Sequence, residues 1–337
     1  MALQFYIEYL KTIPVMQPTV SVIAASETPT RSKLVLPVAL LSVIIGAAAQ
    51  AQTNSCLATA DDLLTGCRRA AQSNHEVALA NCENVPNPDA QQRCRDRAAA
   101  NLKRAQDTCS DEYDVRAAAC QRFGPAPYNP RIDASNFVSR VTNPYFPLPP
   151  GTTFVYEGQT ENGFERDEFA VTHQTRTIMG VTCVQVHDTV YDDGELTEDT
   201  LDWYAQDKEG NVWYFGENTA ELEDGLITTI EGSFMAGVDR AKPGIIMRAH
   251  PFVGDFYRQE FSLANAEDYA ETVSLDATVK LTNGQTYQHC LKSKETTPLE
   301  PDVREFKFYA PGVGEVLEFD QGGSNRLELV RIKSNSE

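Results

Sequence analysis

The stretch CENVPNPDAQQRC, residues 82–94, places a cysteine on each side of a turn that contains Pro86 and Pro88. Four further cysteines flank it, so that six lie at positions 56, 67, 82, 94, 109 and 120. The intervals between them are 11, 15, 12, 15 and 11 residues, which is a palindrome centred on Pro88. Two antiparallel rods that meet at residue 88 would need this spacing if crosslinks joined them at matching heights.

The segments on both sides of the turn are rich in helix-forming residues. An α-helix turns by about 100° per residue, so steps of 11 and 15 residues keep the three cysteines of each segment within an arc of about 80°. We therefore predict a helical hairpin over residues 52–122 with three nested disulfides, Cys82–Cys94, Cys67–Cys109 and Cys56–Cys120. A metal site is disfavoured, because successive cysteines on one helix would lie about 16 to 22 Å apart and zinc needs converging ligands.

Residues 32–52, SKLVLPVALLSVIIGAAAQAQ, have the pattern of a secretory signal, with a basic start, an apolar run and a small-residue cleavage site. We assign residues 1–51 to an N-terminal extension and signal peptide. An uncleaved anchor is the alternative, although the apolar run is shorter than the roughly 20 residues that span a bilayer. The predicted location is the bacterial periplasm or the extracellular space, where disulfides persist, with no stable membrane span after cleavage.

The composition changes after the hairpin. Residues 123–150 contain seven prolines together with large apolar side chains, and we expect this connector to pack along the next domain. Residues 151–337 alternate in hydrophobicity between tight turns, which is typical of an antiparallel meander. The segments GTTFVYE (151–157) and GDFYRQE (254–260) belong to an internal repeat of about 105 residues, which divides this domain into halves of about 151–250 and 251–337.

The predicted fold class is therefore mainly β, a duplicated antiparallel meander that forms a barrel or half-barrel after a disulfide-stapled helical hairpin. Cys183 and Cys290 occupy the same place in the two repeats. They are the two cysteines left over from the ladder, so we predict a disulfide between them.

Aromatic residues give the main indication of function. If DKEG (207–210) forms a four-residue turn, Tyr204 pairs with Trp213 and Trp203 with Tyr214, and each face of this hairpin carries an aromatic pair. One of the two faces must then meet a packed core or a ligand. We take these four residues as the candidate ligand-binding residues, with simple packing as the alternative.

Catalytic and metal motifs are absent from the sequence: it has no nucleophile elbow, H-E-x-x-H, P-loop or dinucleotide glycine pattern. The acidic run YDDGELTEDTLD (191–202) lacks the spacing of a calcium loop, so we interpret it as a solvated acidic loop. We expect no catalytic residues, no metal ion and no cofactor. The net charge of −19 argues against nucleic acid as a partner.

The motifs NPYFPLPPGT, DWYAQDKEGNVWYFGE, AKPGIIM and YAPGVGEVLE resemble those of a family of uncharacterised exported bacterial proteins, over about residues 125–332. This resemblance implies export, but neither an activity nor site residues. The meander is also loosely similar in fold to periplasmic half-barrels that carry lipid.

These observations lead to three hypotheses. The first is an exported, non-enzymatic protein that binds an apolar small molecule or an envelope protein through its β domain. The second is a structural cell-envelope protein that associates through the helical hairpin. The third is a hydrolase that uses acidic residues such as Glu198 and Asp202.

Overall fold

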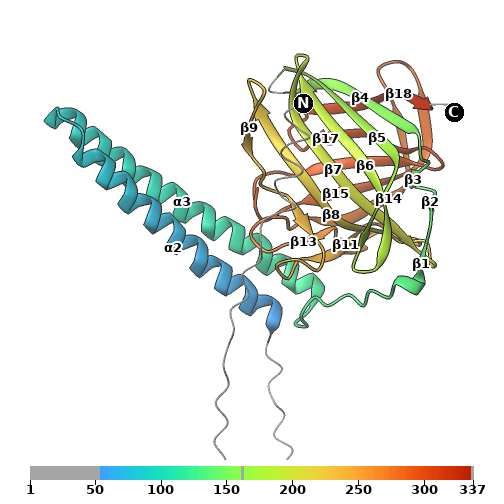
Figure 1. Ribbon diagram of the computed structural model, residues 1–337, viewed down its shortest axis with the longest axis horizontal. Helices are drawn as coiled ribbons and strands as arrows, with labels where there is room; N and C mark the ends of the chain where they lie inside the picture. Colours follow the sequence, from blue (N-terminus) through green and yellow to red (C-terminus); the bar gives the residue numbers. More distant parts are fainter. Residues whose placement is uncertain (1–53, 161–162, 335–337) are drawn as a thin grey trace, which may run out of the picture. The chain divides into compact units, whose positions relative to one another are not determined.

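The computed structural model describes residues 54–160 and 163–334. The predicted N-terminal extension and signal peptide, residues 1–51, lie outside the described residues. The fold is mainly β and is preceded by two antiparallel helices, α2 (Ser55–Glu83) and α3 (Pro88–Phe123) (Figure 1). Neither of these described helices combines the length and the apolar composition needed to cross a membrane.

The helical hairpin has the predicted crosslinks. Cys56–Cys120, Cys67–Cys109 and Cys82–Cys94 are bonded, so the nested order about the turn is confirmed. Each helix begins where an asparagine side chain accepts a backbone N–H, Asn54 for α2 and Asn87 for α3. The hairpin contains few large apolar residues, so the three bridges stabilise what a hydrophobic interface alone would hold weakly.

The rest of the described chain is built from short and long strands, with one 3-10 turn at Ala134–Asn136. The strands are β1 (Phe137–Val138), β2 (Val141–Asn143), β3 (Phe146–Leu148), β4 (Thr152–Thr160), β5 (Gly163–Ile178), β6 (Val181–Asp192), β7 (Glu195–Asp207), β8 (Val212–Glu223), β9 (Leu226–Thr229), β10 (Phe234–Met235), β11 (Lys242–Met247), β12 (Phe256–Arg258), β13 (Glu260–Phe261), β14 (Tyr269–Lys280), β15 (Thr286–Thr296), β16 (Glu305–Ala310), β17 (Gly314–Asp320) and β18 (Arg326–Ser334).

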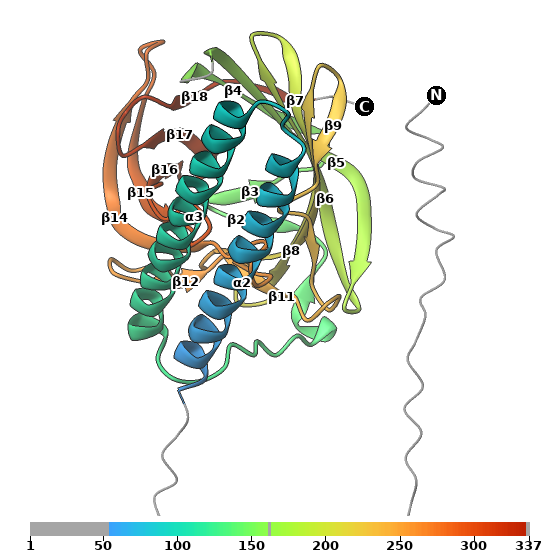
Figure 2. The same ribbon diagram turned by 90° about the vertical axis from the view of Figure 1, so that its left-hand side faces the viewer.

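In the described chain, thirteen of these strands form a nearly closed antiparallel barrel, in the order β12-β14-β15-β16-β17-β18-β4-β5-β6-β7-β8-β11-β13. The last strand, β18, pairs with β4. The other seam lies within residues 256–261, where β12 pairs with β14 and β13 pairs with β11. At this seam Gly244 faces the backbone of Gln259 so closely that a Cβ would lie 2.1 Å from its carbonyl oxygen. Figures 1 and 2 show the sheet curling round on itself.

The connector covers the barrel in two ways. Its short hairpin, β2 and β3, sends Val141, Phe146 and Leu148 into the main core inside the barrel. Phe137 of β1 instead packs on the outer face, with its ring centroid 5.5 Å from that of Phe215. The barrel is therefore filled at one end by chain that precedes it, and its outer face near β7 and β8 is shielded.

The predicted disulfide between Cys183 and Cys290 is wrong, because both are free, buried thiols. Cys183 on β6 belongs to the outer cluster with Trp203 and Phe215, whereas Cys290 on β15 belongs to the main core. The strands β16, β17, β18, β4 and β5 separate them in the sheet. The two thiols therefore lie in different packed clusters, with five strands between them in the sheet.

The predicted register of the aromatic hairpin is also wrong by one residue on β8. The loop is five residues long, since Gln206 pairs with Val212, and Tyr204 therefore faces Tyr214. The cause is Asp207, whose carboxylate accepts the backbone N–H groups of Glu209, Gly210 and Asn211 and organises the wider loop.

Candidate functional site

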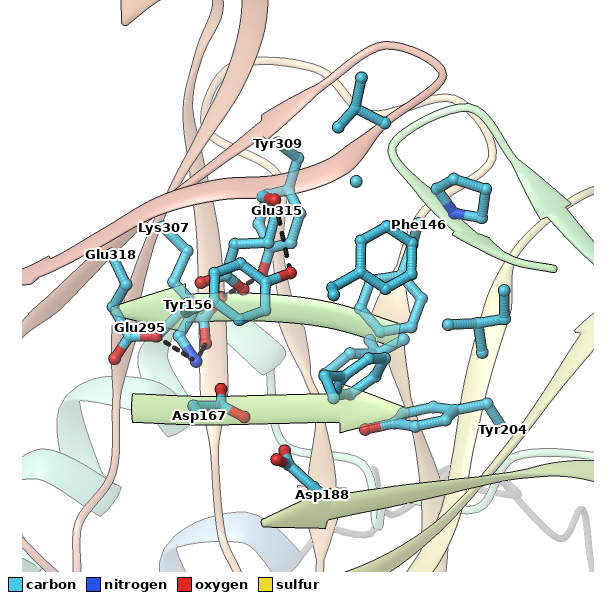
Figure 3. Close-up of a pocket in the computed structure, with 17 residues that line it drawn as sticks. Phe146, Tyr156, Asp167, Asp188, Tyr204, Glu295, Lys307, Tyr309, Glu315 and Glu318 are labelled. Atoms are coloured by element: carbon cyan, nitrogen blue, oxygen red, sulfur yellow. Dashed lines mark hydrogen bonds and ion pairs between the residues drawn. The ribbon is translucent and has the colours of Figure 1, made fainter. Parts of the chain in front are cut away.

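The interior of the barrel contains a cavity of about 170 Å³ with two different sides. The apolar side is formed mainly by Phe146, Phe154, Phe169 and Tyr204. Acidic side chains form the other side, and Figure 3 shows Asp167 and Asp188 near Tyr204 with the remaining acids farther along. The cavity therefore offers an apolar surface and a charged surface to the same occupant.

Asp167 and Asp188 lie on the inner faces of the adjacent strands β5 and β6, where Asp188 is opposite Phe169 and Asp167 is opposite Val190. Burial raises the pKa of Asp167 well above its ordinary value, and the neighbouring Asp188 adds to this effect. Burial also raises the pKa of Asp188. The two carboxyls hydrogen-bond each other when the pair holds a proton, and the Oδ1 of each is buried with no other donor in the described structure.

Lys307 of β16 balances part of this acidity. Its Nζ lies 3.2 Å from Glu318 and 3.8 Å from Glu295, and Figure 3 shows it between these two carboxylates. Burial alone would lower the pKa of Lys307, but Glu318, Glu295 and Glu315 outweigh burial and raise it well above the ordinary value. The lysine therefore stays charged and is already occupied by carboxylates of the wall.

A second cavity, of about 210 Å³, shares Asp188, Tyr204, Glu295 and Lys307 with the first and continues the lumen. Tyr214 donates its hydroxyl to Asp202 across 2.5 Å. Burial raises the pKa of Glu217 to about 8 and that of Asp268 to about 6.

Gln259, from the seam of the barrel, also lines this second cavity. Its side chain is only 2% exposed, and its Oε1 has no hydrogen-bond partner in the described structure. A buried acceptor without a donor costs free energy, so the position favours an occupant that supplies N–H or O–H groups.

The two ends of the lumen differ. The hairpin of β2 and β3 closes one end. Pro147 lines the cavity there, and the backbone oxygen of Pro144 accepts the N–H of Gly312 across 2.7 Å. The opposite end has a recess of about 400 Å³ that shares Glu318 with the inner cavity and is also lined by Glu165 and Glu305. Burial raises the pKa of each of these last two carboxyls to about 7.

The chemistry of the lumen follows from its balance of acidic and basic groups. Among the described residues, Lys307 is the only basic side chain that lines either inner cavity. The acidic side chains that line them are Asp167, Asp188, Glu198, Asp202, Glu217, Glu260, Asp268, Glu295, Glu315 and Glu318. Within residues 54–160 and 163–334, no three His, Cys, Asp or Glu side chains converge in a way that could hold a metal ion. The arrangement suits a molecular cation.

The structure divides the four predicted ligand-binding residues between two surfaces. Tyr204 and Tyr214 stack with ring centroids 4.7 Å apart and line the second cavity. Trp203 and Trp213 instead lie on the outer face, where they pack under the connector with Phe137. A ligand-binding role for these residues stays a prediction, and the lumen geometry favours it for the two tyrosines.

The interpretation of residues 191–202 as a solvated loop is wrong. These residues form the ends of β6 and β7, joined by a tight turn at Asp193 and Gly194. Glu198 and Asp202 face the second cavity, whereas Asp199 faces outward and lies 2.7 Å from His187. Glu198 and Asp202 were named from the sequence, but the other lumen acids were missed, because charged residues on alternating strands normally face water. The sequence did contain a signal for them: these acids occupy the same alternating positions along a strand as aromatic residues do.

Comparisons with known proteins add little to this geometry. A scan against protein-family models and a search of curated proteins both found no match. Among solved structures, the chain is similar to the crystal structure of a "putative lipoprotein" from Parabacteroides distasonis, with 13% sequence identity and a TM-score of 0.30. The match covers 56% of this chain and 98% of that chain. A likeness of this size supports no argument about ligand or fold, and the resemblance to exported bacterial proteins stays a prediction.

Proposed function

We propose that this protein is an exported, non-enzymatic binding protein whose barrel lumen takes up a small organic amine. The ligand would have an aromatic or aliphatic body and a positively charged head that donates hydrogen bonds. Export is supported by the three disulfides of the hairpin, because such bonds form and persist outside the cytosol. The observation that carries the proposal is the two-sided cavity, which the carboxyls of Asp167 and Asp188 line on one side and aromatic rings close on the other.

Size and chemistry both favour such a ligand. A cavity of about 150 Å³ is large enough to bind benzene, and the first lumen cavity measures about 170 Å³. A purely apolar molecule would pair with none of the acidic groups of the lumen and would leave the buried Oε1 of Gln259 without a donor. An ammonium group supplies up to three N–H donors and a charge, and charge-assisted hydrogen bonds are about twice as strong as neutral ones.

Binding of a cation would be linked to proton release. The pKa of both Asp167 and Asp188 is raised by burial, so this pair gives up its protons at a higher pH than ordinary carboxyls do. A positive charge nearby favours the ionised carboxylates, so the protons leave as the ligand binds. The affinity for an amine should therefore increase as the pH rises, for as long as the amine itself stays protonated.

Isothermal titration calorimetry with benzylamine and its neutral analogue benzyl alcohol tests the proposal. We expect benzylamine to bind at least tenfold more tightly, and the double variant Asp167→Asn with Asp188→Asn to lose that preference. Asp199→Asn is the matched control, because Asp199 faces outward near the same strands. Equal binding of the alcohol would point to an apolar-ligand carrier, and binding of neither compound would reject the lumen as an amine site.

A further inference from the structure

A separate pocket, outside the lumen, lies where the base of the helical hairpin meets the barrel. It has a volume of about 250 Å³ and shares no lining residue with the two inner cavities of the lumen. We call it the junction pocket, and define it by Cys56 and Leu63 of α2, Tyr128 of the connector, and Arg258 and Phe261 of the barrel. Most of its wall is apolar.

Arg258 is the unusual residue of this pocket. Its side chain is only 9% exposed, and no carboxylate of the described chain lies within 4.0 Å of its guanidinium. The guanidinium lies over aromatic rings, 4.2 Å from the centroid of Phe123 and 5.1 Å from that of Tyr269, and its Nη2 donates weakly to the Sγ of Cys56 across 3.8 Å. Such rings attract a cation but do not neutralise it, so a buried positive charge remains without a counter-ion.

The one acidic side chain among the described residues that line the pocket, Glu267, is paired with Arg116, and the other charged residues there are basic. Arg240 and Lys242 also line it, and neither forms an ion pair with a carboxylate of the described residues. Lys242 donates to the backbone oxygen of Tyr128, and Arg116 is neutralised by Glu267 and Glu112. The pocket is thus positive in a chain whose net charge is −19.

Helix α2 adds to this field, because its first turn forms part of the wall. Ser55, Cys56 and Thr59 line the pocket. The N-terminus of an α-helix carries a partial positive charge that favours anions. The helix alone would not define a site, but here it meets a buried arginine that lacks an anionic partner.

We propose that the junction pocket binds an anionic amphiphile, a carboxylate with a short apolar chain. Its carboxylate would accept hydrogen bonds from the guanidinium of Arg258, whose planar donors match two carboxylate oxygens. Its chain would lie against Leu63 and Phe261. The opposite charge of the lumen makes the two sites selective for different molecules, and this inference does not depend on the amine site.

Calorimetric titration of the oxidised, exported protein with octanoate and with 1-octanol tests the inference. We expect octanoate to bind at least tenfold more tightly than 1-octanol, with an affinity that falls as salt is added. Arg258→Gln should weaken octanoate binding at least tenfold. Arg176→Gln is the matched control, because Arg176 also lies over a ring, 4.4 Å from the centroid of Trp203, but outside the pocket.

A second variant keeps the test decisive if Arg258→Gln disturbs the fold. Leu63→Trp should fill the pocket without removing any charge and should abolish octanoate binding, while the double lumen variant at Asp167 and Asp188 leaves it unchanged. Failure of octanoate to bind, equal binding of 1-octanol, or unchanged binding to Leu63→Trp would each overturn the inference. Loss of octanoate binding in the lumen variant would move the site into the barrel and overturn it as well.

Discussion

Arg116 of α3 holds Glu267 of the barrel through both Nε and Nη2, with Nη2 2.8 Å from Oε1, although 151 residues separate them in the chain. Glu267 also accepts the backbone N–H of Ala264, and Arg116 reaches Glu112 on its own helix across 2.9 Å. Both partners of the central pair are almost fully buried. This pair therefore joins the hairpin to the barrel, and its hydrogen bonds are satisfied on both sides.

Replacing Arg116 should be costly, because it leaves the buried carboxylate of Glu267 without its cationic partner. We expect Arg116→Met to lower the free energy of unfolding by about 3–5 kcal/mol, and the double variant with Glu267→Met to recover most of the loss. Urea titration followed by circular dichroism measures this. Arg95→Met, which breaks the exposed pair with Glu83, should cost at most about 1 kcal/mol. Similar losses for the two single arginine variants would contradict this view of the junction.

Reduction should separate the behaviour of the hairpin from that of the barrel. All three disulfides lie in the hairpin, and the barrel is held by its own apolar core. We expect dithiothreitol to lower the helical signal at 222 nm while the near-ultraviolet signal of the barrel aromatics persists. A simultaneous loss of both signals would show that the barrel depends on the crosslinks.

The free thiols give a direct check of the corrected cysteine assignment. Burial raises the pKa of Cys183 to about 12 and also raises that of Cys290, so neither should react quickly with a thiol reagent in the native protein. Denaturation without a reductant should then expose two thiols per chain. Detection of no thiols would indicate a disulfide between Cys183 and Cys290. Detection of more than two would contradict the three disulfides of the hairpin.

The lumen acids should make the ligand-free protein less stable as the pH rises. Glu217 has an ordinary pKa of 4.5 when unfolded and about 8 when folded, so the folded state holds its proton more tightly. Its contribution is fully present below about pH 4.5 and is lost as the pH rises to about 8, with a limiting slope of about 1.4 kcal/mol per pH unit.

Urea unfolding at several values between pH 5 and pH 8 measures this slope. Glu217→Gln should reduce the slope by the share of this one group, whereas Glu209→Gln, in the exposed turn after β7, should leave it unchanged. A free energy of unfolding that does not change between pH 5 and pH 8 would mean that the lumen carboxyls titrate normally.

The helical hairpin could be predicted in detail because its constraint is local and periodic. The intervals between cysteines determine which sulfurs share a helix face, and only one nesting brings them together. The barrel class followed from the alternation of residues 151–337 for the same reason. Neither prediction required knowledge of contacts between distant strands.

The lumen required contacts that no local pattern contains. Asp167 and Asp188 face inward because β5 and β6 also point Phe169 and Val186 into the core, and the sequence alone does not tell which face of a strand meets the interior. The aromatic hairpin shows the same limit. A single side chain, Asp207, widened its loop by one residue and moved Tyr214 opposite Tyr204.

The packed end of the lumen has a kinetic consequence. We expect a molecule that binds inside to enter and leave through the acidic recess that shares Glu318 with the cavity, because β2 and β3 fill the other end. A side chain that narrows this route raises one barrier that both directions share, so association and dissociation slow by the same factor. Residence time can then be adjusted by substitutions in the recess near Glu318, and equilibrium affinity by substitutions at Asp167 and Asp188.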